Sequence, residues 1–142
     1  MLPEKPPPDP ALVAETKAWL VKAVTDLRAG EHDLLAVPPL LADAGFRAQQ
    51  AAEKALKGFI TCHNVPFRRI HSLEELGEQC ARLNLTLRPF VDAVVPLTEH
   101  AWKYRYPSDV EEPPRDEIEH ALAAARALFE AVVCRLPQDA RP

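Results

Sequence analysis

Apolar residues recur along this chain every three or four positions, the spacing of a helix with one buried face. No segment shows a convincing alternation of apolar and polar residues, and glycine-rich turns are scarce, so strands are not expected. The pattern predicts an all-α protein with five helices, over residues 10–36, 43–63, 72–84, 89–106 and 115–135.

Residues typical of helix starts mark two of these boundaries. Asp9 followed by Pro10 is typical of an N-cap with proline at the first helical position. Ser72 and Glu75 have the spacing of a capping box, in which Ser72 caps the helix and Glu75 reaches back to the Ser72 backbone. Because the loops are short, neighbouring helices should be antiparallel, which predicts a four-helix up-and-down bundle with one additional helix.

Two positions are unfavourable for the helices that contain them. Gly30 lies inside the first helix and is expected to weaken it, since glycine is a poor helix former. Pro96 lies inside the fourth, where a missing N–H should kink the helix or make it restart.

Length and proline content divide the chain into a body and two tails. A chain of 142 residues is long enough for one domain only, expected over residues 10–136. Residues 1–9 hold four of the fifteen prolines and predict an extended, mobile tail, and residues 137–142 form a second tail.

The composition favours a cytoplasmic protein. Apolar residues make up 47% of the chain without a run long enough to cross a bilayer, and the first residues lack the pattern of a secretory signal. The net charge of −4 argues against a general nucleic-acid binder but leaves room for a local basic patch. Three widely spaced cysteines are typical of buried thiols in a reducing compartment.

The second predicted helix has two contrasting faces. One face gathers small and apolar residues, namely Ala48, Ala52, Ala55, Leu56 and Phe59. The opposite face gathers long polar ones, namely Arg47, Gln50, Glu53, Lys54 and Lys57, and is expected to point away from the core. This polar face either meets a phosphate or a partner protein, or is a solvated surface in which Glu53 and Lys57 pair at i and i+4.

The fourth predicted helix carries more apolar surface than one neighbour can cover. Beside its core-facing stripe runs a second one, formed by Val91, Val95 and Trp102. Two explanations remain open: a homodimer formed through this helix, or coverage of both stripes by the fifth helix.

Four landmarks, in order, span about residues 15–135. They are Trp19 to Leu27 followed by Leu34-Leu35; Phe46-x-x-Gln49-Gln50-Ala51-x-Glu53-Lys54-x-Leu56-Lys57; Ile70-His71-Ser72-Leu73-x-x-Leu76; and Tyr104-Arg105-Tyr106-Pro107. In this order and spacing they resemble the HEPN domain (higher eukaryotes and prokaryotes nucleotide-binding domain), a family of small helical proteins.

The resemblance implies four core helices plus a fifth, a homodimer, and a binding role toward nucleotide or RNA. Small HEPN proteins are often encoded beside a minimal nucleotidyltransferase, as toxin–antitoxin modules, which implies such a partner here. Some members are metal-independent ribonucleases that carry an arginine followed, several positions later, by a histidine. No histidine follows Arg105 at that distance, and the next one is His120. We therefore expect recognition rather than turnover, and no catalytic residue.

The expected nucleotide- or partner-binding residues are Gln50, Glu53, Lys54, Lys57, His71, Tyr104 and Arg105. Arg105 either clamps an anion or interacts with the carbonyls at its helix end. His71 either contacts a phosphate or ties its loop to a neighbouring carbonyl. The alternative function is a divergent ribonuclease toxin with His71 or His100 as the base and Arg105 as the cation.

No cofactor or metal is expected. Phosphate loops, nucleophile elbows and H-E-x-x-H strings are missing from the sequence. Glu117 and His120 have the i, i+3 spacing of a di-iron bundle motif, but such sites need two of these pairs and further glutamates, and the chain offers one.

Overall fold

The computed structural model describes residues 6–107 and 110–142, and within them it is all-helical, without a strand. Residues 1–5 of the predicted N-terminal tail lie outside this part. The α-helices are α1 (Pro10–Leu35), α2 (Leu41–Cys62), α3 (Leu73–Leu83), α4 (Arg88–Val94) and α5 (Arg115–Val133). Three short 3-10 helices accompany them, η1 (Leu85–Leu87), η2 (Val95–Ala101) and η3 (Gln138–Ala140). The five predicted helices and the all-α fold are confirmed.

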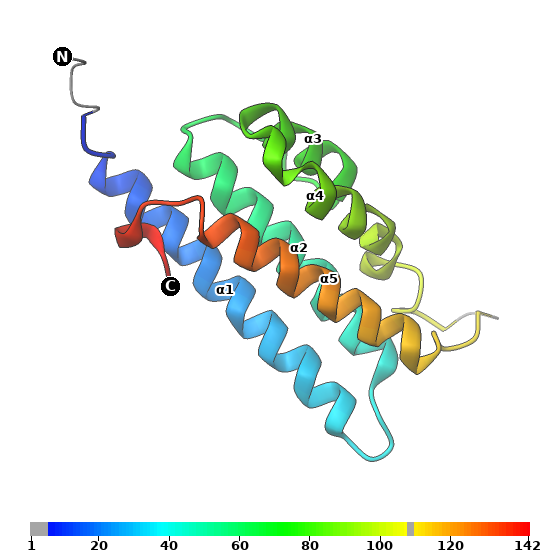
Figure 1. The fold of residues 1–142 in the computed structure, drawn as a ribbon. Helices are drawn as coiled ribbons and strands as arrows, with labels where there is room; N and C mark the ends of the chain where they lie inside the picture. Colours follow the sequence, from blue (N-terminus) through cyan, green and yellow to red (C-terminus); the bar gives the residue numbers. More distant parts are fainter. Residues whose placement is uncertain (1–5, 108–109) are drawn as a thin grey trace.

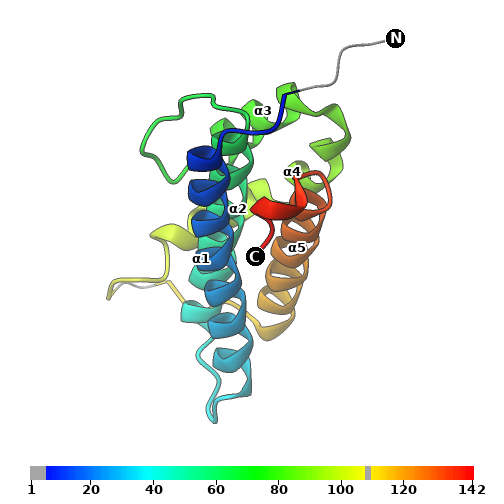
Figure 2. The same cartoon turned by 90° about the vertical axis from the view of Figure 1, so that its left-hand side faces the viewer.

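Helix α2 is the central element of the bundle. It lies antiparallel to α1 and packs also against α5, η2 and α3, while α4 lies between α3 and α5 (Figures 1 and 2). Five of its six alanines are fully buried, which allows neighbouring helices to approach closely; they are Ala44, Ala48, Ala51, Ala52 and Ala55. Leu56, Phe59 and Ile60 fill the core beside them. One face of α2 is thus fixed by packing, as predicted.

Helix α1 runs through Gly30 without interruption, as one long helix. The residue is buried, and a Cβ built on it would lie 2.6 Å from Leu122 Cδ2 of α5 and 3.3 Å from Arg47 Cβ of α2. Glycine here allows three helices to meet, so its cost in helix propensity is accompanied by a packing role that spacing alone could not reveal.

The interruption predicted at Pro96 is confirmed. Helix α4 ends at Val94, and the chain continues as η2, which ends at Ala101. Helix α3 covers part of the second apolar stripe. Val91 of this stripe is buried against Gly77 of α3, since a Cβ built on Gly77 would lie 2.4 Å from Val91 Cγ1. Trp102 is 62% exposed. The explanation by α5 alone is therefore wrong, and the homodimer stays a prediction.

Both predicted caps are present. Asp9 Oδ1 accepts a hydrogen bond from Ala11 N at 2.9 Å, and Ser72 Oγ accepts one from Glu75 N at 3.2 Å. The Glu75 carboxylate pairs with Arg68 and not with the Ser72 backbone, so the second half of the predicted capping box is wrong. At the other end of the chain, the predicted tail 137–142 contains η3, whose Ala140 is buried. Across the described residues, no helix combines the length and apolarity needed to cross a membrane.

Candidate functional site

The polar face of α2 is largely covered. The Glu53 and Lys57 side chains are only 4% and 10% exposed, and Gln49 is fully buried. The prediction that Glu53 and Lys57 point to solvent is wrong. Helical geometry correctly put them opposite the alanines, but Trp19 of α1 and the loop 63–72 lie over that side.

Glu53 is the centre of a hydrogen-bonded network. Its Oε1 lies 2.7 Å from His71 Nδ1, and its Oε2 lies 3.4 Å from Lys57 Nζ. Gln49 Nε2 reaches Glu53 Oε1 at 3.5 Å and donates to the His71 carbonyl at 3.3 Å. Gln50 Nε2 in turn donates to Gln49 Oε1 at 2.7 Å. A buried carboxylate with this many donors is compensated for its lost hydration.

His71 is attached to the network by one edge of its ring. Its Nδ1 faces Glu53, while the side chain as a whole is 70% exposed. The tautomer assigned on this geometry donates from Nδ1 to the carboxylate and leaves Nε2 as an acceptor. The predicted tie to a neighbouring carbonyl is wrong, since the partner is a carboxylate.

Lys57 is enclosed by aromatic rings. Its Nζ lies 5.5 Å from the centroid of Trp19 and 5.9 Å from that of Phe67, and these two rings meet edge to face at 6.2 Å. The ammonium therefore has Glu53 on one side and two π-faces on the other. Lys57 balances a buried charge in this conformation and is poorly placed to reach a ligand.

Lys54 belongs to a different charge cluster, between α1 and α2. Its Nζ lies 2.5 Å from Asp26 Oδ2, and Arg47 Nη1 lies 3.2 Å from Asp26 Oδ1. The Asp26 side chain is 4% exposed, so the two cations compensate a buried carboxylate. The sequence signal for Asp26 is its place in α1 among the buried residues Ala23, Leu27 and Gly30.

A second carboxylate near the turn between α1 and α2 is perturbed. Burial of Asp33, together with the neighbouring Asp43, raises the pKa of Asp33 from 3.8 to about 7, while the charge of Arg47 opposes the rise. Asp43 itself pairs with Arg47 at 3.4 Å.

Tyr104 and Arg105 lie beside the N-terminal half of α2. The Arg105 guanidinium carbon is 3.8 Å from the Phe46 ring centroid. Arg105 and Phe46 line a cavity of about 260 Å³, together with Ala42, Asp43 and Tyr104. Phe46 and Lys57 are eleven residues apart on α2, roughly 16 Å along its axis. Arg105 and Lys57 therefore do not converge, and Gln50 lies between their positions along α2.

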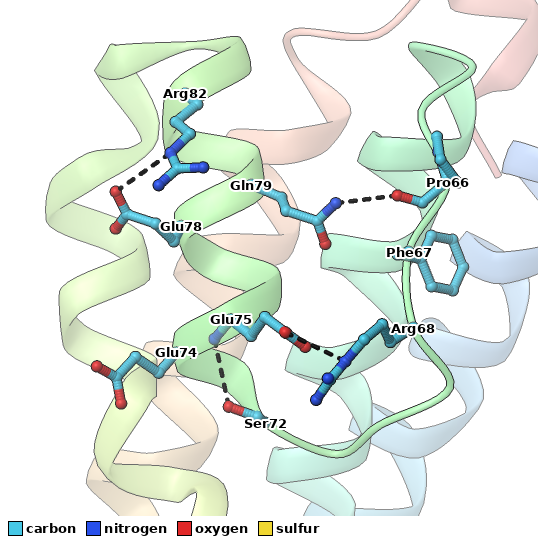
Figure 3. A pocket seen from close by; sticks show the side chains of 9 residues that line it. All are labelled: Pro66, Phe67, Arg68, Ser72, Glu74, Glu75, Glu78, Gln79 and Arg82. Carbon is cyan, nitrogen blue, oxygen red and sulfur yellow. Dashed lines mark hydrogen bonds and ion pairs between the residues drawn. The ribbon is translucent and has the colours of Figure 1, made fainter.

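A larger cavity of about 880 Å³ lies between residues 66–68 and α3, on the side of the loop 63–72 away from Glu53 (Figure 3). Glu74, Glu75 and Glu78 line it, against two arginines that are already paired, Arg68 with Glu75 at 3.2 Å and Arg82 with Glu78 at 3.8 Å. Gln79 Nε2 donates to the Pro66 carbonyl at 3.0 Å. Three carboxylates make this cavity a poor place for a phosphate.

Comparison with known families gives one result: the HEPN domain matches residues 16–136. The chain belongs to the HEPN family. Comparisons with curated proteins and with solved structures found no match. The matched region includes the whole α2 face, the loop with His71 and the segment with Arg105, so it covers every predicted site residue.

In this HEPN domain the predicted site residues form three groups. Glu53, Lys57, Gln50 and His71 share one network, Lys54 belongs to the Asp26 cluster, and Tyr104 and Arg105 stand beside Phe46. The stripe from Phe46 through Gln50 to Glu53 links the first and third groups along one side of α2.

Sequence reasoning named His100 as an alternative base but missed its burial in the HEPN core. His100 of η2 is 3% exposed, stacks on Tyr104 at 5.3 Å, and has no hydrogen-bond partner at Nδ1 among the described residues. Burial lowers the pKa of His100, with Glu117 opposing the shift. Because only 3% of His100 is exposed, it is a poor candidate for the base of a ribonuclease.

Proposed function

We propose that this HEPN domain binds a phosphate group of a nucleotide or of RNA beside Arg105, as a recognition module. The observation that carries the proposal is the Arg105 guanidinium, stacked 3.8 Å from the centroid of the Phe46 ring. Stacking holds a guanidinium in one plane and leaves its N–H edge available for two phosphate oxygens. Within the described residues Arg105 has no carboxylate partner, since Asp43 in the same cavity pairs with Arg47.

The surroundings of Arg105 suit a nucleotide. Tyr106, the next residue, is 73% exposed and offers a ring face on which a base can stack. Gln50 is half-buried one turn from Phe46 and supplies an amide, and the exposed ring of His71 lies further along the same side of α2. A short single-stranded segment running along α2 would therefore meet the cation of Arg105, the amide of Gln50 and the imidazole of His71 in turn.

The test is fluorescence anisotropy of a labelled single-stranded RNA, with ATP as competitor, at several salt concentrations. Arg105→Ala should weaken RNA binding by about tenfold, because a bidentate charged contact is lost. Arg105→Lys should also weaken binding, since an ammonium cannot form the planar fork. Arg82→Ala, at a side chain 77% exposed on α3, is the control and should change little. Equal affinity of the wild type and Arg105→Ala would refute the proposal.

A second candidate function is favoured by the contact between Glu53 and His71. A buried carboxylate 2.7 Å from Nδ1 orients an exposed imidazole, which is how a general base is commonly held. Nε2 could then take the proton of an RNA 2′-hydroxyl, so that the 2′-oxygen attacks the adjacent phosphorus and the 5′-oxygen leaves.

This ribonuclease function predicts cleavage that survives chelation of metals. His71→Ala should abolish the cleavage and Glu53→Gln should reduce it, while His120→Ala, at an exposed histidine of α5, should not. Intact RNA after prolonged incubation with wild-type protein would leave binding as the function.

Assembly is part of the proposal as well. Trp102 and Val110 are large apolar residues exposed near one another in the chain, and a homodimer would bury them. Light scattering should give the mass of two chains, and Trp102→Ser should shift it toward one. The further partner proposed from the family is a minimal nucleotidyltransferase of a toxin–antitoxin pair, which copurification with the product of a neighbouring gene would test.

A further inference from the structure

Three potential metal ligands from two separate elements meet at the side of the bundle. Glu99 and His100 come from η2, and Glu117 comes from the first turn of α5. One ligand atom from each lies within 4.8 Å of the other two. His100 Nε2 is 3.7 Å from Glu117 Oε1, which is beyond hydrogen-bond distance.

The imidazole of His100 is the unusual member of this group. It is 97% buried, Nδ1 lacks a hydrogen-bond partner among the described residues, and Nε2 faces Glu117 without bonding to it. Neither tautomer gives this ring its usual hydrogen bonds, and a buried unsatisfied polar group is costly. A cation bound at Nε2 would give this nitrogen the partner that it lacks, with the ring proton on Nδ1.

We propose that His100 Nε2 and carboxylate oxygens of Glu99 and Glu117 bind one zinc ion at the junction of η2 and α5. One imidazole and two carboxylates are donors that zinc accepts, and water completes a four-coordinate site. The Glu99 and Glu117 side chains are 40% and 42% exposed, so the ion enters from solvent and His100 forms the floor of the site.

The distances are close to those that zinc requires. Donor atoms around a tetrahedral zinc ion lie about 3.4 Å apart, given metal–ligand bonds of about 2.1 Å. The separation of 3.7 Å between His100 and Glu117 is near that value, and rotation of the exposed glutamates closes the remainder. Lys103 Nζ lies 3.4 Å from Glu99 Oε2, which leaves Glu99 Oε1 for the metal.

A bound zinc ion would restrain the segment that leads to Arg105. Residues 95–101 form a 3-10 helix, and the chain after it leads to Tyr104 and Arg105. A metal at Glu99 and His100 would fasten this segment to α5. The proposal goes beyond phosphate binding and does not depend on it, because zinc affinity is measured without any nucleotide.

The experiment uses the full chain without an affinity tag. It carries Cys134→Ser, because this thiol is exposed, contrary to the predicted burial of the cysteines, and could itself bind zinc. Zinc is titrated by calorimetry, and thermal unfolding is followed with and without zinc. One equivalent should bind and raise the melting temperature. Glu117→Gln should weaken binding by about tenfold or more, as expected when a ligand is lost.

Three further variants complete the test. Glu119→Gln is the matched control on the same helix, because Glu119 is exposed and pairs with Arg115 at 2.9 Å. It should bind zinc like the parent. His100→Ala should lose binding, and Glu99→Gln gives the same information without disturbing the core. No heat of binding by the parent, or equal affinity for Glu117→Gln and Glu119→Gln, would overturn the proposal.

Discussion

Glu53→Gln removes the charge at the centre of the α2 network while it keeps the shape of the side chain. The Glu53 side chain is 4% exposed, and its partner Lys57 is 10% exposed at 3.4 Å. After the substitution, Lys57 is left as a nearly buried cation, and among the described residues the Trp19 and Phe67 rings remain as its compensation. The amide nitrogen of glutamine can also face Lys57 Nζ, where donor meets donor.

The expected loss is about 3 kcal/mol in the free energy of unfolding, the lower end for breaking one side of a buried ion pair, because the aromatic rings remain. In urea this corresponds to a midpoint lower by about 1.5 M if the slope is about 2 kcal/mol per M. Far-UV circular dichroism and tryptophan fluorescence, which reports on Trp19 beside Lys57, should give the same midpoint.

Two comparisons decide whether burial is the reason. Glu78→Gln breaks a pair with Arg88 at 2.8 Å, but Glu78 is 44% exposed, so its loss should stay below about 1 kcal/mol. Lys57→Met in the Glu53→Gln background removes the stranded cation and should restore about half of the lost stability. Burial is not the cause if Glu53→Gln lowers the free energy of unfolding no more than Glu78→Gln does. The same holds if the loss in the double variant equals the sum of the losses in its single variants.

Two further predictions concern other parts of the bundle. Since the pKa of Asp33 is raised to about 7 in the folded chain, folding binds a proton there, and the stability from this proton is present at low pH and lost as pH rises through 7. Asp33→Asn, which mimics the protonated acid, should stabilise the protein by about 2 kcal/mol near pH 8 and by almost nothing near pH 4. Asp92→Asn, at an exposed carboxylate, is the control and should show no such trend. An effect of Asp33→Asn that did not depend on pH would contradict this prediction. Gly77→Ala places a methyl 2.4 Å from Val91 Cγ1 and should cost about 1–2 kcal/mol, crowding less the gain in helix propensity. Gly77→Ala with Val91→Ala should cost about 1 kcal/mol less than the two losses added, and strict additivity in urea unfolding would contradict the packing argument.

The helices could be predicted from the sequence because their signals are local. Apolar spacing located all five, and Asp9, Ser72 and Pro96 marked boundaries that the structure confirms. These signals depend on residues within one or two turns of each other, so they need no knowledge of tertiary packing. Gly30 shows the limit, because its role depends on Leu122, far away in the chain.

The site was predicted less well because helical geometry gives the direction of a side chain but not what covers it. Glu53 and Lys57 are opposite the alanines of α2, as predicted, yet Trp19 and Phe67 enclose Lys57. The burial of His100 could not be predicted from the sequence, since its neighbours Gly45 and Glu117 come from α2 and α5. Longer-range arrangements of this kind appear only when the helices are assembled.

The loop 63–72 has a different neighbour on each side. His71 is held by Glu53 of α2, whereas Pro66, Phe67 and Arg68 form one wall of the cavity in Figure 3. A small molecule that filled this cavity and shifted the wall would change how the imidazole is presented. Linkage makes such an effect mutual: RNA held at His71 would alter the affinity for that molecule by the same factor. The cavity is thus a place from which binding on the far side of the loop could be tuned without competition.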